Sequence, residues 1–317
     1  MKKIFSFLVV LMFVFIVDVL AQDSFESRQL TFDVAQNGFP SWSPDGKSIV
    51  YQYTDMRGDT LGKNGLWVIS SDGTGAKQIF KGLAEHAKWS PDGRFIVFDA
   101  DTGNSIKMIP VDGGDPISFL PDSIMIQNGG LPCWSPDGVR LAFLERKGFS
   151  ICIYDMKTDH VKSIFSEVGM LPLPGCWSRD GKYVLVGLWD RPARKSTIWK
   201  VSSDGREKIQ IMGHHENFFR HLALSPDGSL LIYAALEGKY LGLWVMPAEG
   251  GKSIPLATTP NTHNEGASWS PDGKSIAFTS TRSGNFDIWI MELDVERLKK
   301  ELMKLMNEKV LDRKSVV

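Results

Sequence analysis

The chain has 317 residues, enough for one large domain or two domains of ordinary size. Its formal net charge of −1 gives no electrostatic reason to expect nucleic acid as a partner. Hydrophobic residues make up 43% of the sequence, which supports a large core, and 30 glycines, 16 prolines and 10 tryptophans favour an all-β chain rich in turns.

The first 21 residues predict a secretory signal. "MKK" is basic, an apolar run of 17 residues follows, and Val19 and Ala21 are the small residues typical of a cleavage site. We therefore expect residues 1–21 to be removed and the mature chain to be periplasmic or secreted. The alternative is an uncleaved membrane anchor, although a run of this length with Asp18 inside it is short for spanning a bilayer.

A five-residue motif recurs six times along the chain, and its spacing predicts the fold. The serines of the six copies stand 43 to 47 residues apart. A period in the mid-forties is typical of a propeller blade, which consists of four short strands and their turns. The copies are "WSPDG" at 42–46, 89–93, 134–138 and 269–273, "WSRDG" at 177–181 and "LSPDG" at 224–228.

Each copy predicts the same local structure. In the last one, "GASW" is a short strand, "SPDG" is its turn, and "KSIAFTS" and "FDIWIMEL" are the second and third strands. Proline presets φ in the turn, aspartate bonds back to the backbone, and glycine supplies the left-handed conformation at the end. We therefore expect a positive φ at the six motif glycines: Gly46, Gly93, Gly138, Gly181, Gly228 and Gly273.

Nine of the ten tryptophans fall in two aligned columns, one in the first strands and one in the third. These columns indicate packing between blades. A weaker fourth strand follows in five of the six units, and residues 28–32, "RQLTF", stand at the corresponding offset ahead of the first motif. The sequence thus predicts an all-β, six-bladed propeller over residues 22–294, closed by its N-terminal strand, because closure removes exposed sheet edges.

The stretches "LTFDVAQNGFPSWSPDGKSIVY" and "ASWSPDGKSIAFTSTRSGNFDIWIMELD" resemble the WD40-like repeats of TolB and the wider TolB-like group. The resemblance covers about residues 28–294 and implies a six-bladed propeller. TolB itself carries an α/β domain ahead of its propeller, whereas about seven residues separate the expected cleavage site from the first strand here. The resemblance implies a protein-binding scaffold whose partner is an envelope protein or a peptidoglycan-linked lipoprotein. Some TolB-like propellers are similar to metal-dependent lyases of pectic oligosaccharides, whose ligands are mainly histidines at the channel mouth, and the resemblance implies this as the alternative function.

Histidines and acidic residues gather in the predicted loops between blades. Equivalent positions at the start of the innermost strands converge on the mouth of a central channel, where they could bind a partner, a polar ligand or a divalent metal. The alternative is that these residues are polar only because loops lie at the surface. The candidate binding residues of this group are Glu85, His86, His221, His263 and Glu265, and the same loops hold His214, His215 and Glu216.

The tenth tryptophan, Trp189, lies outside both columns, in "GLWDRPARKS". The same loop brings Arg191 to the same face, and a tryptophan beside an arginine is typical of an interface hot spot. Alternatively, Trp189 folds down over the edge of its blade. We add Trp189 and Arg191 to the candidate partner-binding residues.

The rest of the sequence favours a binding protein over an enzyme. It contains no HExxH, G-x-S-x-G, Walker or Cys-x-x-Cys motif, so no catalytic residue, metal ligand or cofactor is assigned. Three cysteines, Cys133, Cys152 and Cys176, fall in predicted strands and do not suggest a disulfide framework. Residues 295–317 predict an amphipathic helix and a tail that pack on the propeller or pair with a partner.

Overall fold

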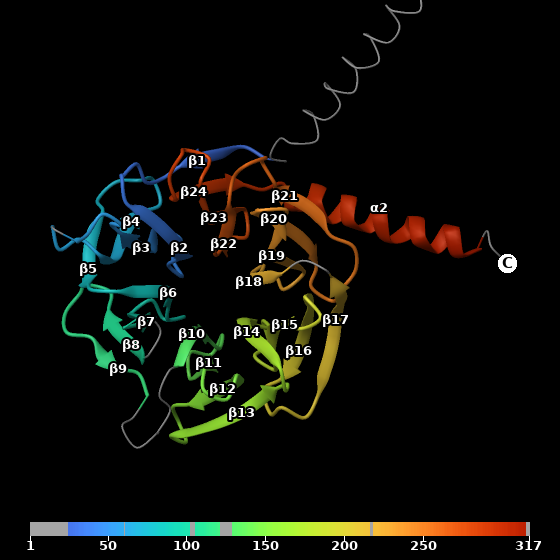
Figure 1. The fold of residues 1–317 in the computed structure, drawn as a ribbon, viewed down its shortest axis with the longest axis horizontal. Coiled ribbons are helices and arrows are strands. Elements are labelled where there is room, and N and C mark those ends of the chain that lie inside the picture. Colours follow the sequence, from blue (N-terminus) through green and yellow to red (C-terminus); the bar gives the residue numbers. More distant parts are fainter. Residues whose placement is uncertain (1–24, 60, 102–104, 121–128, 216–217, 315–317) are drawn as a thin grey trace, which may run out of the picture.

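The computed structural model describes residues 25–59, 61–101, 105–120, 129–215 and 218–314. These residues form six four-stranded antiparallel sheets set radially around one axis, with a helix at the C-terminal end (Figure 1). The prediction of an all-β, six-bladed propeller with a C-terminal helix is confirmed. The expected signal at residues 1–21 lies outside the described residues.

The blades are numbered in chain order and their strands run from the centre outwards. Blade one contains β2 (Gln36–Trp42), β3 (Ser48–Thr54), β4 (Gly65–Ser70) and β5 (Lys77–Lys81), and blade two contains β6 (Ala84–Trp89), β7 (Phe95–Ala100), β8 (Ser105–Pro110) and β9 (Ile117–Ser118). Blade three contains β10 (Gly129–Trp134), β11 (Arg140–Glu145), β12 (Ser150–Asp155) and β13 (His160–Ser166), and blade four contains β14 (Met170–Trp177), β15 (Tyr183–Asp190), β16 (Lys195–Ser202) and β17 (Lys208–His215). Blade five contains β18 (Phe219–Leu224), β19 (Leu230–Glu237), β20 (Tyr240–Pro247) and β21 (Ile254–Ala257), and blade six contains β22 (Asn264–Trp269), β23 (Ser275–Ser280), β24 (Asp287–Glu292) and, from the N-terminal end, β1 (Ser27–Gln29).

The repeated motif forms a self-contained turn at the end of each innermost strand. In blade one, the Ser43 hydroxyl donates to the Asp45 carboxylate at 2.6 Å and accepts from the Ser48 amide at 2.9 Å. The Gly46 amide closes the turn on the Ser43 carbonyl at 2.9 Å. All six motif glycines have φ between 67° and 78°, which confirms the prediction made from the turn chemistry. We call the side of the ring that carries these turns the turn face, and the opposite side the loop face.

Neighbouring blades interlock through the same motif. A Cβ built on Gly46 would lie 3.6 Å from Cδ of Pro271, so the proline of one blade packs on the turn glycine of the next. The motif tryptophans add hydrogen bonds between blades: the indole N–H of Trp89 donates to the Ser41 carbonyl at 3.1 Å. Trp177 and Trp269 make the equivalent bond to the carbonyls of Cys133 and Ala223. The predicted role of the tryptophans between blades is therefore seen directly in these three.

The N-terminal strand closes the ring, as predicted. β1 pairs antiparallel with β24, the third strand of blade six. Beyond β1, the Leu30 amide donates to the Ile288 carbonyl at 2.8 Å, and the Thr31 hydroxyl donates to the buried Asp287 carboxylate at 3.0 Å. Leu30 is 2% exposed and packs between blades six and one. The strand is shorter than predicted and starts one residue earlier, but the segment as far as Thr31 still completes blade six.

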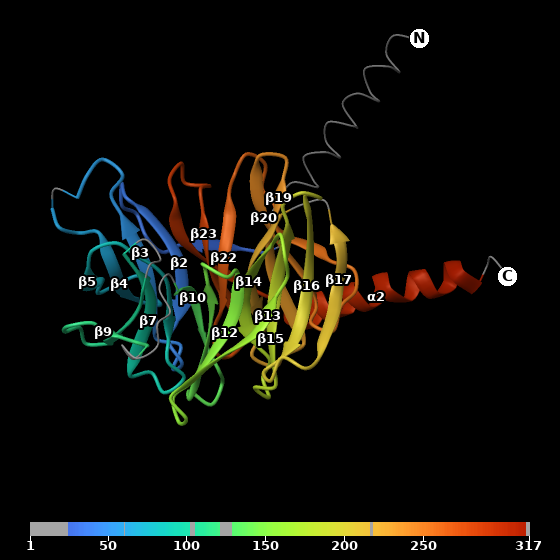
Figure 2. The same cartoon turned by 60° about the horizontal axis from the view of Figure 1, so that its bottom comes forward.

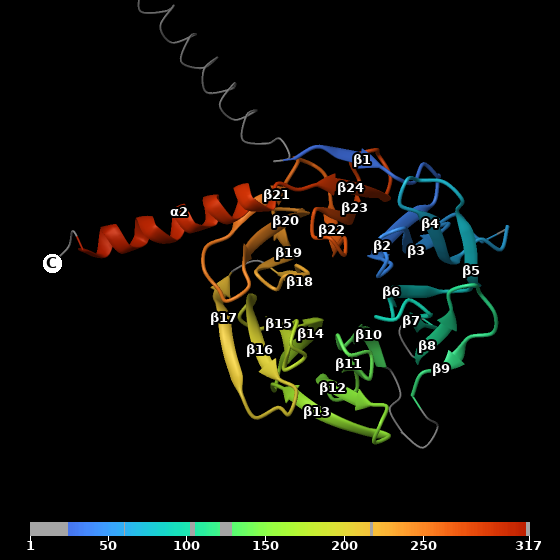
Figure 3. The same cartoon turned by 180° about the vertical axis from the view of Figure 1, so that it is seen from behind.

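Helix α2 (Val295–Lys314) begins directly after blade six and packs on its own propeller at its start. Leu298 and Leu302 are buried in the cluster that joins blades five and six. Met303 and Met306 are exposed, and Figures 2 and 3 show the helix extending away from the propeller. No helix in the described ranges is both long enough and apolar enough to cross a bilayer.

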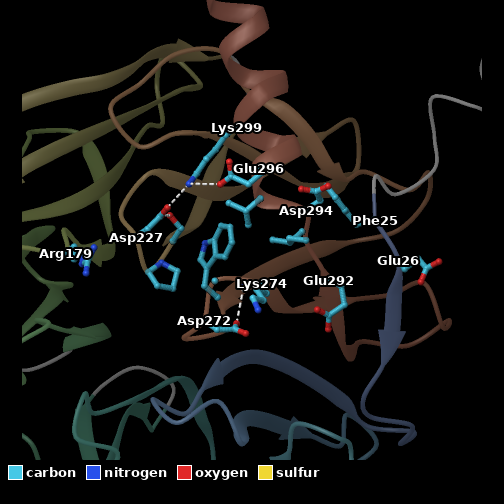
Figure 4. A pocket seen from close by; sticks show the side chains of 16 residues that line it. Phe25, Glu26, Arg179, Asp227, Asp272, Lys274, Glu292, Asp294, Glu296 and Lys299 are labelled. Atoms are coloured by element: carbon cyan, nitrogen blue, oxygen red, sulfur yellow. Dashed lines mark hydrogen bonds and ion pairs between the residues drawn. The ribbon is translucent and has the colours of Figure 1, made fainter.

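An open groove of about 960 Å³ lies where α2 meets the turn face (Figure 4). Several of its polar groups are engaged with one another or with neighbouring side chains. The Lys299 ammonium reaches from the helix to the Asp227 carboxylate at 2.9 Å, and the Glu292 carboxylate accepts from the Ser275 hydroxyl at 2.8 Å. We therefore interpret this groove as the place where the helix packs on the propeller. The candidate functional site lies in the central channel.

Candidate functional site

At one equivalent position in each innermost strand, the chain turns toward the channel axis. This position lies three residues before the motif tryptophan, or before Leu224 in blade five, and a β-bulge interrupts the pairing of the strand there. Five of the six positions have φ between 51° and 64°, while the sixth is a proline, whose ring fixes φ at a negative value. The six residues, which we call the channel ring, are Phe39, His86, Leu131, Pro174, His221 and Gly266.

The channel ring brings two predicted histidines together. His86 belongs to blade two and His221 to blade five, on opposite sides of the propeller (Figure 1). Their ring centroids are nevertheless 6.0 Å apart, and the Phe39 ring packs against both, at 4.5 Å from His86 and 5.1 Å from His221. Gly266 makes room for this cluster, since a Cβ there would lie 3.2 Å from Cδ1 of Phe39. The ring encloses a constriction of only about 50 Å³.

His86 is held by a buried carboxylate. Its Nδ1 lies 3.0 Å from Oδ2 of Asp99, a residue of β7 that is only 1% exposed. The other oxygen of Asp99, Oδ1, accepts from the Leu131 amide at 2.8 Å. The Arg146 guanidinium lies 3.8 Å from Oδ2. These contacts tie together the innermost strands of blades two and three and fix the orientation of the imidazole.

His221 stands in a second couple of the same kind. Its Nδ1 lies 3.4 Å from Oε2 of Glu265, and the Arg220 guanidinium lies 2.6 Å from the same oxygen. These are ion-pair distances, and neither contact has the angle of a hydrogen bond. A short rotation of either side chain would make one. Two carboxylate–imidazole–guanidinium sets therefore face each other across the constriction.

Burial sets the charge of this second couple. It lowers the pKa of His221 well below its ordinary value, and the nearby His86, Arg220 and Lys88 act in the same direction. His221 is therefore neutral at neutral pH. Burial raises the pKa of Glu265, although Arg220 opposes that shift. Glu265 is 6% exposed, so its carboxylate is buried at the channel mouth, next to the irregularity in the pairing of β22 with β23.

Glu85 lies on the loop face of the same channel. Together with Glu265 it lines a cavity of about 210 Å³ whose other walls include Gln36 and Asn37, at the start of blade one's innermost strand. Glu85 and Glu265 each stand four residues before the tryptophan of their motif, and both line this one cavity. Glu85, His86, His221 and Glu265 form a continuous candidate site, which we call the loop mouth.

The remaining candidates that the structure describes line neither the constriction nor the cavity that holds Glu85 and Glu265. His263 accepts from the Leu241 amide at 3.3 Å through its Nδ1 and packs between the rings of Tyr240 and Phe286. The Trp189 ring packs edge-on against Phe218, and the Arg191 guanidinium lies 5.8 Å from the centroid of the Phe149 ring. The candidate Glu216 and the side chains of His214 and His215 lie outside the described part of the chain.

Sequence reasoning missed the groups that hold the histidines in place, namely Asp99, Arg146 and Arg220, and the ring of Phe39. One signal was available for Asp99, because an aspartate inside the apolar strand "FIVFDA" needs a buried partner. The cavity that the channel ring encloses has no serine, threonine or cysteine among the residues that line it in the described structure. The two carboxylate–imidazole couples therefore lack the nucleophile that would make either one a hydrolytic triad.

Comparison with known proteins agrees with this architecture. No family model matches the chain. An uncharacterized protein of Agrobacterium fabrum is 29% identical over 151 residues, 46% of this chain and 47% of that protein. The Tol-Pal system protein TolB of Anaeromyxobacter dehalogenans is 28% identical over 197 residues, 61% of this chain and 43% of that protein. The matched parts thus span less than half of the length of these curated relatives.

Solved structures share the fold at lower sequence identity. A structure assigned to TolB of Agrobacterium tumefaciens has a TM-score of 0.63 and 19% identity, covering 84% of this chain and 93% of that one. An oligogalacturonate lyase in complex with manganese has a TM-score of 0.60 and 14% identity, covering 86% and 94% of the two chains. Repeats, closed ring and similarity to TolB together identify the chain as a TolB-like six-bladed β-propeller.

Proposed function

We propose that this chain is an exported, non-catalytic scaffold of the cell envelope that binds a protein partner at the loop mouth. The partner class follows from the similarity to TolB of the Tol-Pal system: an envelope protein or a peptidoglycan-linked lipoprotein. A propeller closed by its own N-terminal strand is a rigid support, and binding residues usually accumulate in the loops of such a support.

The observation that carries the proposal is the difference between the two faces. The turn face repeats nearly the same five residues six times, because each copy builds the same turn. The loop face instead brings Phe39, His86 and His221 into one cluster, backed by the buried carboxylates of Asp99 and Glu265. An aromatic centre with fixed polar groups around it is typical of the core of an interface.

A metal-dependent lyase is the second candidate, favoured by the structural similarity to the oligogalacturonate lyase. Catalytic metal sites usually have at least three protein ligands. The channel ring supplies two imidazoles, His86 and His221, and no group of three His, Cys, Asp or Glu residues suited to a metal occurs in the described ranges. The donor set therefore does not fit, and we derive no lyase chemistry from it.

Binding to the peptidoglycan-associated lipoprotein of the same organism tests the proposal. Replacing His86 and His221 together by Asn keeps a donor near the Nδ1 position, so Asp99 and Glu265 retain their partners while both rings are lost. We expect this variant to keep its stability and to bind the lipoprotein at least about tenfold more weakly by calorimetric titration, a loss of about 1.4 kcal/mol.

The matched control replaces Lys47 and Lys182, two lysines next to the turns, by Ala. This variant should bind like the original protein. Equal binding by the histidine variant, or a loss confined to the lysine variant, would move the working surface to the turn face. Elemental analysis of the purified protein tests the second candidate. A stoichiometric divalent metal that is present in the original protein and absent from the histidine variant would favour the lyase.

A further inference from the structure

A second mouth of the channel opens on the turn face. This cavity, which we call the vestibule, has a volume of about 400 Å³ and lies on the far side of the constriction from the loop mouth. Such a volume is within the range of about 300–1,000 Å³ that holds small-molecule ligands. Its walls are formed largely by four motif tryptophans and three motif prolines: Trp89, Trp134, Trp177, Trp269, Pro91, Pro136 and Pro226.

Two cations are the only charged side chains among the described residues that line the vestibule, and no carboxylate lines it. Lys88 lies at the inner end, because it also lines the constriction, and Arg179 lies at the outer edge, where it also borders the groove under α2. None of the hydrogen bonds or ion pairs found in the described ranges involves either cation. Within the described ranges, neither cation therefore has a carboxylate at ion-pair distance.

Lys88 is half-buried, and its side chain lines both the vestibule and the constriction. Burial accordingly lowers its pKa. The groups that face it are Cys133 of blade three and Cys176 of blade four, and His86 and His221 at the constriction. Burial raises the pKa of both thiols. A buried ammonium without a counter-ion is costly unless an anion joins it.

The sequence departs from its own repeat at this site. Arg179 replaces the motif proline in blade four only, and its Cβ takes the place of that proline, 3.7 Å from the Cβ that Gly228 would carry. Leu224 replaces the motif tryptophan in blade five only. Both departures lie at the junction of blades four and five. Leu224 is smaller than the tryptophan of the other blades, so the vestibule wall is set back there, and the Arg179 guanidinium replaces the apolar ring of proline. Turn formation requires neither change.

We propose that the vestibule binds a small organic anion through one carboxylate. The carboxylate pairs with the Lys88 ammonium at the inner end, and the apolar body of the ligand packs on the motif tryptophans, with Arg179 near the entrance. A single internal ammonium balances one negative charge, which favours a carboxylate over a phosphate dianion. The carboxylate could belong to a free organic acid or to the C-terminus of a peptide. This inference is independent of the loop mouth and its partner.

Titration with 3-phenylpropionate, followed by tryptophan fluorescence, tests the proposal. We expect a saturable change, and binding at least tenfold weaker for the neutral 3-phenylpropionamide. Lys88→Met keeps the apolar stem and removes the charge, and it should abolish the difference between acid and amide. Lys182→Met, an exposed lysine on the same face, is the matched control and should behave like the original protein. A short peptide ending in phenylalanine, with a free or an amidated C-terminus, distinguishes the two sources of the carboxylate.

A second measurement does not depend on the fold of a variant. Amine-reactive labelling of the original protein, mapped by mass spectrometry, should modify Lys88 at neutral pH and be slowed by bound 3-phenylpropionate or by the free peptide, but not by the amides. Absence of saturable binding by both carboxylates, equal binding of acid and amide, or unchanged labelling of Lys88 in their presence would each overturn the proposal.

Discussion

Leu30 offers the sharpest test of ring closure. It is 2% exposed and contacts the cores of blades six and one, while its amide donates to Ile288. Replacing it by Ala removes three buried carbon atoms and leaves a cavity at the junction between blades six and one, where the N-terminal segment meets the C-terminal blade. Substitutions of this kind cost about 2–5 kcal/mol, and we expect about 3 kcal/mol because the rigid sheets on both sides collapse little. Urea unfolding followed by tryptophan fluorescence measures the loss.

Phe32 is the matched control, since it lies two residues further along the same segment and is 77% exposed. Phe32→Ala should change the free energy of unfolding by less than about 0.5 kcal/mol. The two variants together separate packing at the closure from general effects of the segment. If Leu30→Ala unfolds at the same urea concentration as Phe32→Ala, the N-terminal segment does not hold the ring closed.

Two further predictions concern the repeated turn. Gly46→Val should cost about 1–3 kcal/mol, because φ there is 71° and the new side chain meets Pro271 of the neighbouring blade, and unchanged urea unfolding would refute this. Hydrogen bonds from Ser90 and from the Arg94 amide lower the pKa of Asp92 to about 2. The ionised Asp92 carboxylate therefore stabilises the fold above pH 3.8, and this contribution is lost as the pH falls toward 2. The free energy of unfolding should decrease over that range, and it should decrease less in Asp92→Asn. A flat profile would contradict this prediction. The other motif aspartates, whose pKa values are lowered as well, reinforce the effect: Asp45, Asp137, Asp180, Asp227 and Asp272.

The fold could be predicted because its determinants are local and repeated. The serine, aspartate and glycine of each motif bond within their own turn, so the sequence of one copy specifies its structure without its neighbours. Ring closure was also predictable, because five units have a fourth strand and the sixth can obtain one only from the N-terminal side. The sheet register could not be predicted to the residue, and β1 accordingly starts at Ser27 and ends at Gln29.

The candidate site was predictable only in part, because it depends on contacts between distant blades. Sequence alignment placed His86 and His221 at equivalent positions, but the bulge that turns them toward each other follows from φ values of 51° and 55° that no local pattern announces. For the same reason the burial of Glu265 could not be read from the sequence. Asp99 was missed because its partner, His86, lies on the preceding strand and only the pairing of β6 with β7 brings them together.

The two mouths of the channel carry opposite chemistry, and the repeat explains how one scaffold can hold both. Blade geometry requires only the motif turn and an apolar strand on each side of it, so the residues that do not serve the turn are free to differ. At the channel ring they become phenylalanine, histidine, leucine, proline, histidine and glycine, and the loop mouth gains two buried carboxylates matched by arginines. At the vestibule, Arg179 and Leu224 replace two motif residues, and no carboxylate is among the described residues that line it with Lys88. A constriction of about 50 Å³ separates the two, too small to pass a ligand that fills the vestibule. The shared tryptophans and prolines supply the apolar walls of the vestibule, whereas its two charges, Lys88 and Arg179, stand at positions where the blades differ. Function in this propeller is therefore to be sought where the blades differ from one another.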